Sequence, residues 1–503
     1  MGQIVTNEMF SIQDYPQGKR RALLINPPVY DAQYWARWSQ PAGLLRIATL
    51  LRTKGYQIDF IDCMETNERG MVTKSRRYDT DGKPLIVKRD NIIKSIYRFG
   101  LSLEELENRL KSLEVPDEVW ITSIMTYWWE STRDVVALVK RLFPHALVLV
   151  GGIYPTLAPE HAQEHLGADI IFKGEIREAS QLPTDLSLYS KPPTYAILAT
   201  SRGCPWDCVY CAARTLNGGA KVRTRTTEDI LEEIQYKHQQ LGIRRFGFYE
   251  DNALINREHF AEVMHAIIGS GLSLDLYAPE GFETRLLDEE LLRLMKRAGF
   301  QKVHLPLETV RTDINRQWNR RHASTGSFER ALDAAIRAGF RPHTQEINAF
   351  VLFGLPDERL EDVVDSTLYA HHVVGSVIPM LFSPVPSTHV FRNHSHYLLN
   401  EMGWDLQNLN GKFLPFLEYN QRNNPELRAS DYLELEGFMS ILNDGKIHSR
   451  SMDICDNSLA GQGFREVLND RNKKFIRTAI SEHMQYSELQ DHLQMAKTAN
   501  SAY

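Results

Sequence analysis

The stretch TSRGCPWDCVYCAA, residues 200–213, holds three of the five cysteines of this 503-residue chain. Cys204, Cys208 and Cys211 fall within eight positions, directly after the short apolar run TYAILAT. A run of this length and composition is typical of a buried strand. We therefore expect the three thiols to lie on a loop that leaves the end of a strand.

Several kinds of site use cysteines at close spacing. A structural zinc ion needs four ligands, and the next histidine, His238, lies inside a predicted helix. A disulfide would leave one thiol unused, and five cysteines suit a reducing compartment better than a disulfide framework. Thiolates are the normal ligands of iron-sulfur clusters. Three thiolates on a four-iron cluster leave one iron open for a substrate or a cofactor.

The cysteine stretch opens a series of alternating strands and helices. The strand candidates are TYAILAT, RRFGFYE, LSLDLYA, KVHLPLE, INAFVLFG and SVIPMLFS. Between them lie helical patterns such as TTEDILEEIQYKH, in which Thr226 and Asp229 predict an N-terminal cap. Six such units predict a partial, open barrel over residues 194–388, with reactive groups at the carboxyl ends of its strands.

With its aromatic Tyr210 before the last cysteine, this CxxxCxxC motif resembles the signature of radical S-adenosylmethionine enzymes. The resemblance implies a [4Fe-4S] cluster on Cys204, Cys208 and Cys211. It also implies that the cluster cleaves S-adenosylmethionine to a 5′-deoxyadenosyl radical. The S-adenosylmethionine contacts that it implies, besides Tyr210, are Asp251, Asn252, Glu308, Gly354 and Pro356, in the stretches FYEDNALI, KVHLPLETV and NAFVLFGLPDE.

Residues 21–178 contain an earlier series of strand candidates: RALLIN, YQIDFI, EVWITSI, ALVLVG and ADIIFK. Short, nearly all-apolar runs that alternate with helical patterns predict a doubly wound parallel sheet, a Rossmann-like α/β fold. Residues 1–20 are predicted to be a tail, 64–100 an insertion, 179–193 a linker and 389–503 a helical C-terminal region.

The 21–178 segment resembles the cobalamin-binding domain that precedes the radical domain in one branch of this family. The resemblance is carried by INPP, PAGLLRIATLL, TSIMTYWW and VGGIYPTLAPEHA. It implies corrin contacts at Ser123, Gly151, Gly152 and Tyr154. The chain lacks the Asp-x-His-x-x-Gly stretch that supplies a histidine to cobalt in methionine synthase, and the alternative is that the fold is kept without the corrin.

These features predict a radical S-adenosylmethionine enzyme that uses cobalamin to methylate an unactivated carbon. The alternatives are a radical rearrangement, cyclisation or oxidation without methyl transfer, and an iron-sulfur electron carrier or redox protein. We expect a small-molecule substrate and an electron donor such as flavodoxin or ferredoxin. A net charge of −6 gives no reason to expect a broad nucleic-acid surface. No apolar stretch is long enough to span a bilayer, and we expect a cytoplasmic protein without a membrane partner.

Overall fold

The computed structural model describes residues 2–448, apart from residue 17 and the ranges 34–39, 68–70 and 321–322. Its first half is built on a six-stranded sheet in which every neighbouring pair is parallel. The strand order is β4 (Tyr56–Asp62), β2 (Arg20–Asn26), β9 (Glu118–Ser123), β10 (Leu147–Gly152), β11 (Ile170–Lys173) and β1 (Gln3–Thr6). This is the doubly wound order of flavodoxin-like sheets, whose ligands bind where the order reverses, here between β2 and β9.

Both faces of this sheet are buried, because alternate residues of each strand point to opposite sides. Leu23 and Ile25 pack with α2 (Leu103–Lys111) and α3 (Trp129–Leu142), whereas Ala22 and Leu24 pack against α1 (Ala42–Thr53). The two apolar layers explain why these strands appear in the sequence as mainly apolar runs without strict alternation.

Strand β1 lies in the segment that the sequence predicts to be a tail. Gln3–Thr6 pairs in register with Ile170–Lys173 and forms the edge of the sheet. A four-residue edge strand has one partner and no amphipathic pattern of its own. Only the pairing with β11 reveals it.

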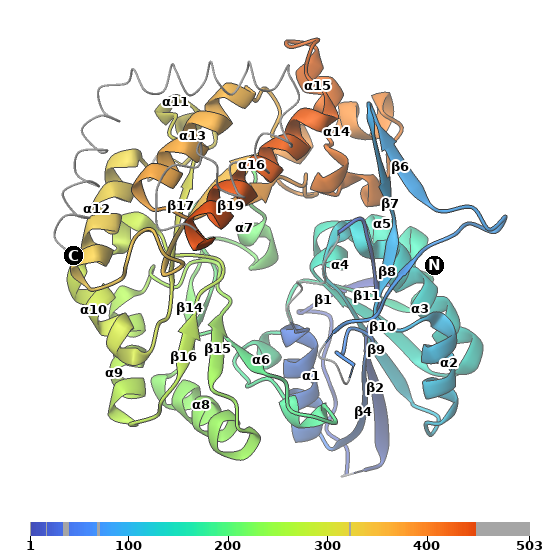
Figure 1. The fold of residues 1–503 in the computed structure, drawn as a ribbon. Helices are drawn as coiled ribbons and strands as arrows, with labels where there is room; N and C mark the ends of the chain where they lie inside the picture. The colour runs from blue at the N-terminus through green and yellow to red at the C-terminus, as the bar shows by residue number, and fades with distance from the viewer. Residues whose placement is uncertain (1, 17, 34–39, 68–70, 321–322, 449–503) are drawn as a thin grey trace.

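The predicted insertion forms a small β-structure beside the sheet. Strands β3 (Val29–Asp31), β8 (Tyr97–Phe99) and β5 (Lys74–Arg76) pair antiparallel, and β6 (Ile86–Arg89) with β7 (Ile92–Ser95) makes a hairpin that reaches the C-terminal helices (Figure 1). At this contact the buried Arg89 guanidinium donates to the carbonyl oxygen of Phe413, at 2.7 Å.

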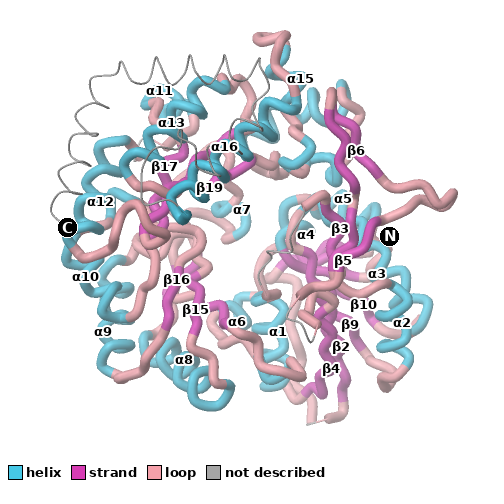
Figure 2. The backbone as a smooth tube through the Cα atoms, viewed as in Figure 1, coloured by secondary structure: helices cyan, strands magenta, loops and turns pink. Residues whose placement is uncertain are grey.

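The second half contains all six predicted strands, as two parallel three-stranded sheets. The first has β12 (Tyr195–Leu198), β15 (Arg245–Phe248) and β16 (Asp275–Tyr277), and the second has β17 (Val303–Glu308), β18 (Ile347–Phe353) and β19 (Val377–Leu381). Helices α8 (Thr227–Leu241), α9 (Arg257–Gly269), α10 (Glu289–Ala298), α12 (Thr325–Arg337) and α13 (Leu360–Val373) cover them outside, as a partial barrel (Figure 2). Thr226 caps α8 as predicted, since its side chain accepts from Asp229 N.

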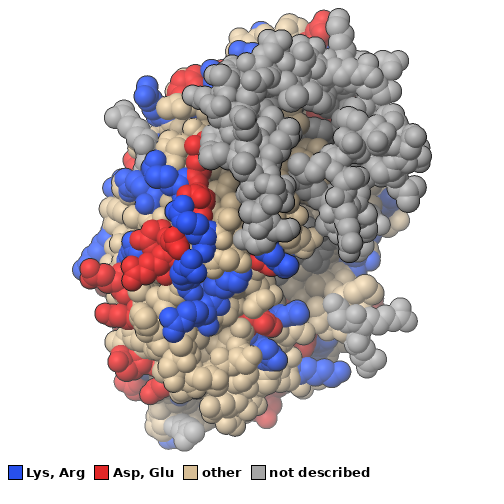
Figure 3. Space-filling view, turned by 60° about the vertical axis from the view of Figure 1, so that its left-hand side comes forward, with Lys and Arg blue, Asp and Glu red and all other residues tan. Residues whose placement is uncertain are grey.

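The described part of the C-terminal region is helical, as predicted, and ends in α16 (Ala429–His448), which packs on α13 and β19. Residues 449–503 lie outside the described residues. Within the part of the chain that the structure covers, no helix combines the length and apolarity needed to cross a membrane. Both charge signs lie side by side on the face shown in Figure 3.

One link between the first half and the C-terminal region passes through His161 on α5 (Pro159–His165). Its Nδ1 lies 2.6 Å from the Tyr154 hydroxyl and its Nε2 lies 2.7 Å from Asp405 Oδ1. Among the described residues, one group of three His, Cys, Asp or Glu side chains is close enough to share a metal ion. It consists of His161, His165 and Asp405. Because both ring nitrogens of His161 already have protein partners, we interpret this group as a structural link.

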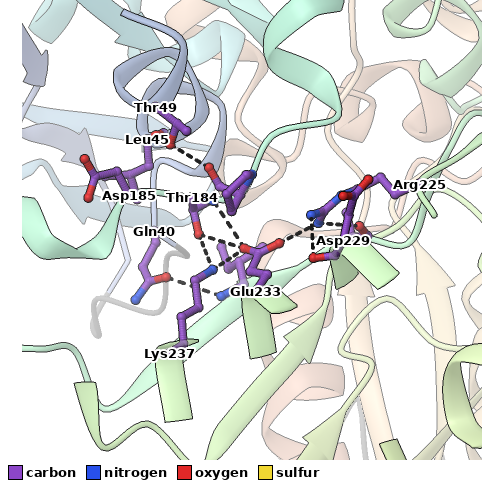
Figure 4. A network of polar contacts seen from close by, with 12 residues as sticks. Gln40, Leu45, Thr49, Thr184, Asp185, Arg225, Asp229, Glu233 and Lys237 are labelled. Atoms are coloured by element: carbon purple, nitrogen blue, oxygen red, sulfur yellow. Dashed lines mark hydrogen bonds and ion pairs between the residues drawn. The ribbon is translucent and has the colours of Figure 1, made fainter. Parts of the chain in front are cut away.

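A buried polar network fastens the two halves at the predicted linker (Figure 4). The Glu233 carboxylate on α8 accepts from Arg225 at 2.5 Å and also pairs with Lys237, while Lys237 Nζ donates to Thr184 Oγ1 at 2.5 Å. The linker in turn contacts α1, because Thr49 Oγ1 donates to the carbonyl oxygen of Pro183 at 2.7 Å. All three charged side chains of the network are at most 3% exposed.

We expect Glu233→Gln to destabilise the protein strongly. Burial alone would raise the pKa of the Glu233 carboxyl, but the charges of Lys237 and Arg225 lower it to about 2, so the group is ionised. Removing its charge leaves two buried cations, a change worth about 3–5 kcal/mol in the free energy of unfolding. Urea denaturation at pH 7 measures it.

The matched control is Glu114→Gln, since Glu114 pairs with Arg21 at 2.6 Å but is 80% exposed. Because the folded-state pKa of Glu233 is lowered, the difference between wild type and Glu233→Gln is present above the unfolded-state value of about 4.3. It shrinks as the pH falls towards 2. Equal stability of the two variants at pH 7 would refute the assignment.

Candidate functional site

A cavity of ≈ 1620 Å³ lies where the carboxyl ends of the two sets of strands face each other. Its wall includes Gly151 and Gly152 from β10, Phe246 from β15 and His304 from β17. Figure 1 shows the two halves on either side, with α1 and α6 (Arg177–Ser180) at their junction. Parallel α/β sheets bind ligands at this edge, so the cavity is the candidate site.

Cys204, Cys208 and Cys211 all line this cavity, on the loop that follows β12 and β13 (Ser201–Arg202). Cys204 is buried, Cys208 is intermediate and Cys211 is exposed. Gly203 precedes them with φ +107°, and a Cβ there would lie 2.4 Å from the carbonyl oxygen of Lys221. Only glycine fits this close approach at a positive φ.

Two carboxylates from the end of β15 hold the cysteine loop. Glu250 is buried and accepts from Thr200 N at 2.7 Å and from Ser201 N at 3.1 Å. Asp251 accepts from Gly203 N at 2.8 Å. Asp251 also lines the cavity, so the predicted S-adenosylmethionine contact touches the base of the cysteine loop.

Asn252 and the cysteine loop share one carboxylate. Asn252 Nδ2 and Trp206 Nε1 each donate to Glu283 Oε2, at 2.8 Å. All three side chains belong to residues that line the cavity. This arrangement connects Trp206, on the cysteine loop, to Asn252 after β15 and to Glu283 after β16.

Arg320 supports the loop from the other side. Its Nη1 donates to Tyr210 Oη at 2.7 Å and lies 2.5 Å from Glu308 Oε1. Glu308, at the end of β17, has a φ of +63°, a conformation that costs energy in a residue with a side chain and that clusters at functional sites. Both partners of Arg320 were predicted from the sequence, but Arg320 was not, because no motif or periodicity marks it.

Desolvation of the sulfur atoms makes these thiols poor acids when no metal is bound, including the thiol of Cys211, although that residue as a whole is exposed. Desolvation raises the pKa of Cys204 to about 11 and that of Cys208 to about 12, and it also raises the pKa of Cys211. The three sulfur atoms do not all lie within 4.8 Å of one another, which is the spacing expected for ligands of one metal ion. Three thiols that face one cavity without converging on a point suit a polynuclear cluster better than a single ion.

The predicted corrin contacts divide into two pairs. Gly151 and Gly152 line the cavity, and Gly152, with φ +115°, sits so close to Ser123 that a Cβ would lie 2.4 Å from its carbonyl oxygen. Ser123 and Tyr154 are buried and are not part of the cavity wall. The Ser123 hydroxyl accepts from Thr132 at 2.9 Å, whereas the Tyr154 hydroxyl contacts His161.

Gly354 and Pro356 also lie outside the cavity wall, unlike the other predicted S-adenosylmethionine contacts. Gly354 N donates to Glu358 Oε1 at 2.9 Å, and a Cβ on Gly354 would lie 2.9 Å from the Leu381 side chain. In this structure the glycine lets β18 end in a tight turn against β19.

Comparison with known proteins identifies the second half of the chain. The Radical SAM superfamily matches residues 198–367, which span the cysteine loop, Glu250–Asn252, Glu308 and Arg320. This segment is a radical SAM domain. Its boundaries enclose β15, β16, β17 and β18 and the last residue of β12, whereas β19 lies beyond them.

Relatives extend the similarity beyond the radical SAM domain. Cytidylyl-2-hydroxyethylphosphonate methyltransferase from Streptomyces wedmorensis is 21% identical over 75% of this chain and 82% of its own length. Hopanoid C-3 methylase from Methylococcus capsulatus is 28% identical over 40% of this chain and 37% of its own length. The chain therefore matches most of the first relative and about a third of the second.

A solved structure shares the fold of both halves. The radical S-adenosylmethionine methyltransferase TsrM from Kitasatospora setae aligns with a TM-score of 0.56 and 15% identity, over 76% of this chain and 77% of that chain. This coverage is too large for the radical SAM domain alone. The predicted architecture, an α/β sheet followed by a partial barrel, is confirmed.

We expect Gly203→Ala to destabilise the protein by roughly 1–3 kcal/mol, because the new Cβ collides with backbone at Lys221 in a conformation that alanine avoids. Urea denaturation compares it with Gly269→Ala on α9, where a Cβ meets nothing within 4 Å. The control should leave stability unchanged or raise it slightly. Equal effects of the two substitutions would contradict the steric argument.

Proposed function

We propose that this protein is a cobalamin-dependent radical SAM methyltransferase. The observation that supports it most is the common cavity, which brings the CxxxCxxC cysteines and the Gly151–Gly152 strand end together. In this proposal residues 194–388 hold the cluster and S-adenosylmethionine, and residues 21–178 hold the corrin. The substrate is a small molecule, and flavodoxin or ferredoxin supplies electrons in the cytoplasm.

The donor set fits a [4Fe-4S] cluster on Cys204, Cys208 and Cys211. Three soft thiolate donors line the same cavity. Arg320 also lines it, and its positive charge favours the Cys208 thiolate. When bound, the cluster supplies the electron that cleaves S-adenosylmethionine, and the corrin supplies the methyl group. The protein's part is to position these groups and to keep water out.

Four of the predicted S-adenosylmethionine contacts fit that role, because Tyr210, Asp251, Asn252 and Glu308 line the cavity beside the cysteines. Asp251 and Glu308 keep a carboxylate at the wall while each is held by a neighbour, Gly203 N and Arg320 respectively. Aromatic side chains of the barrel complete the wall. By excluding water they protect a reactive radical from side reactions.

The fit of a corrin rests on space. Gly151 has no side chain at the wall, and a Cβ there meets only Phe172 Cβ, at the ordinary contact distance of 3.7 Å. A flat macrocycle can approach such a strand end closely. The methyl-transfer proposal also agrees with the relatives, since a second TsrM structure, with a TM-score of 0.55 and 15% identity, contains cobalamin and a [4Fe-4S] cluster.

A radical reaction without methyl transfer is the second candidate. Anaerobic magnesium-protoporphyrin IX monomethyl ester cyclase from Synechocystis is 29% identical over 23% of this chain. Detecting a methylated product, and not 5′-deoxyadenosine alone, separates the two functions.

We expect each of Cys204→Ser, Cys208→Ser and Cys211→Ser to lose reductive S-adenosylmethionine cleavage down to the level of a protein-free blank. Each removes one of three thiolates, and a cluster held by two is not retained. After anaerobic reconstitution, iron per chain and 5′-deoxyadenosine are measured. Cys63→Ala is the matched control, since Cys63 is buried beside β4 and away from the cavity wall. Deoxyadenosine formation by any of the three serine variants at the wild-type rate would refute the ligand set.

We expect the wild-type protein to retain hydroxocobalamin through gel filtration, seen as a corrin absorbance band, and Gly151→Leu to lose it. Leucine fills the wall where the macrocycle would lie, while the fold and the cluster remain. Gly326→Leu on the outer helix α12 is the control, because a Cβ there would approach only the flexible Arg330 side chain, at 3.6 Å, and Ser324 Oγ, at 4.0 Å. Equal retention by Gly151→Leu would place the corrin elsewhere, and no retention by the wild type would remove it from the proposal.

A further inference from the structure

Arg46 is a buried cation without a partner among the described residues. The side chain lies on α1, the residue is 5% exposed and it belongs to the cavity wall. Its Nε has no hydrogen-bond partner, and no ion pair forms with a described residue. Burial lowers the pKa of Arg46 to about 10, which still leaves it charged at neutral pH. A buried guanidinium without a counter-charge is costly unless a ligand supplies one.

The carboxylates near Arg46 already serve other cations. Glu233 and Glu175 are the acidic groups that act most strongly on it. Glu233 pairs with Arg225 and Lys237, whereas Glu175 pairs with Arg223 at 2.5 Å and lies 3.5 Å from Arg202. With Arg46, five cations therefore share two carboxylates. The surplus is positive, and it lies at the wall of the cavity, because Arg46, Arg202 and Glu175 all line it.

The start of α1 adds backbone donors to the same wall. Gln40, Pro41, Ala42, Gly43 and Leu44 line the cavity. Pro41 has no N–H group, and Gln40 N and Ala42 N already donate to Tyr195 Oη and to the carbonyl oxygen of Gln40. Gly43 N and Leu44 N are therefore the donors without a partner among the described residues. The helix has no side-chain cap and no acidic residue in its first turn. Gly43 presents no side chain, and a Cβ there would meet nothing within 4 Å. An uncapped helix N-terminus attracts anions through its free N–H groups and its dipole.

We propose that Arg46, with Arg202 and the N-terminus of α1, binds a phosphate-type oxyanion of a ligand in this cavity. A tetrahedral oxyanion accepts from a guanidinium and from backbone N–H groups at the same time, and the positive surplus suits a group with several charged oxygens. Two ligands offer this chemistry: a substrate with a phosphate or phosphonate group, and the phosphodiester in the nucleotide tail of cobalamin. The choice of cobalamin as a source of the anion, and the participation of the ligand in catalysis, rest on the proposed function.

The first test uses pyrophosphate and the apoprotein, so it needs neither cluster nor turnover. At millimolar pyrophosphate and constant ionic strength, we expect the melting temperature of the wild type to rise. Arg46→Gln should show no rise, and its pyrophosphate affinity by calorimetry should be roughly ten- to hundredfold weaker. Arg52→Gln is the control on the same helix, because Arg52 is half exposed and pairs with Asp185 at 2.8 Å.

The fold of Arg46→Gln is checked in the same experiment. Since the substitution removes an unpaired buried charge, we expect the melting temperature of this variant without ligand to equal or exceed that of the wild type. A lower value would assign Arg46 a structural role and overturn the proposal. An absent response in the wild type, or an equal response in Arg46→Gln, would overturn it as well.

A second pair of measurements identifies the source of the anion. Hydroxocobalamin carries the phosphodiester, whereas cobinamide lacks it. If Arg46→Gln weakens binding of hydroxocobalamin but not of cobinamide, the anion belongs to the cofactor. If neither affinity changes while the pyrophosphate response is lost, it belongs to the substrate. Equal weakening of both corrinoids would overturn the proposal, because Arg46 would then contact the ring and not a phosphate.

Discussion

The orientation of the six-stranded sheet and the partial barrel, with the carboxyl ends of their strands facing each other, is the constraint on which the site depends. Parallel strands place their connecting loops, and thus their chemically active side chains, at one edge. Each half alone would present an open edge to solvent. Facing each other, they enclose one cavity, with the cysteine loop on one wall and Gly151–Gly152 on the other. Every contact between cofactor and substrate that we propose requires this arrangement.

The buried junction keeps that orientation. Glu233, Lys237 and Thr184 join α8 to the linker, and the linker joins α1 through Thr49. Charged groups at this depth add little net stability compared with apolar packing, but their partners are specific. A hydrophobic contact tolerates sliding, whereas a carboxylate that satisfies two cations does so in one position. The network therefore bears on the alignment of the halves more than on the strength of their contact.

The sequence predicts most of the fold because the strands are buried on both faces. INAFVLFG and EVWITSI are apolar at most positions, and such runs between helical patterns have few other interpretations. The cysteine motif was equally readable, since its spacing is local. Strand β1 was missed because its identity depends on β11, which lies more than 160 residues away. For the same reason Ser123 and Tyr154 were predicted at the cavity, although their side chains turn to Thr132 and His161.

Arg320 and Arg46 could not be found from the sequence, because what marks them is the balance of partners around a buried charge. Arg320 has Glu308 and Tyr210, whereas Arg46 has no partner among the described residues. Of the ten described side chains with an unpartnered buried polar atom, four line the cavity: Arg46, Arg202, His304 and Arg320. At His304 burial lowers the pKa to about 4, so the ring is neutral at pH 7 and its unpartnered Nδ1 can donate or accept. Folded proteins leave few such atoms unsatisfied. That four of them border one cavity, from both halves of the chain, indicates that ligand atoms supply the missing partners.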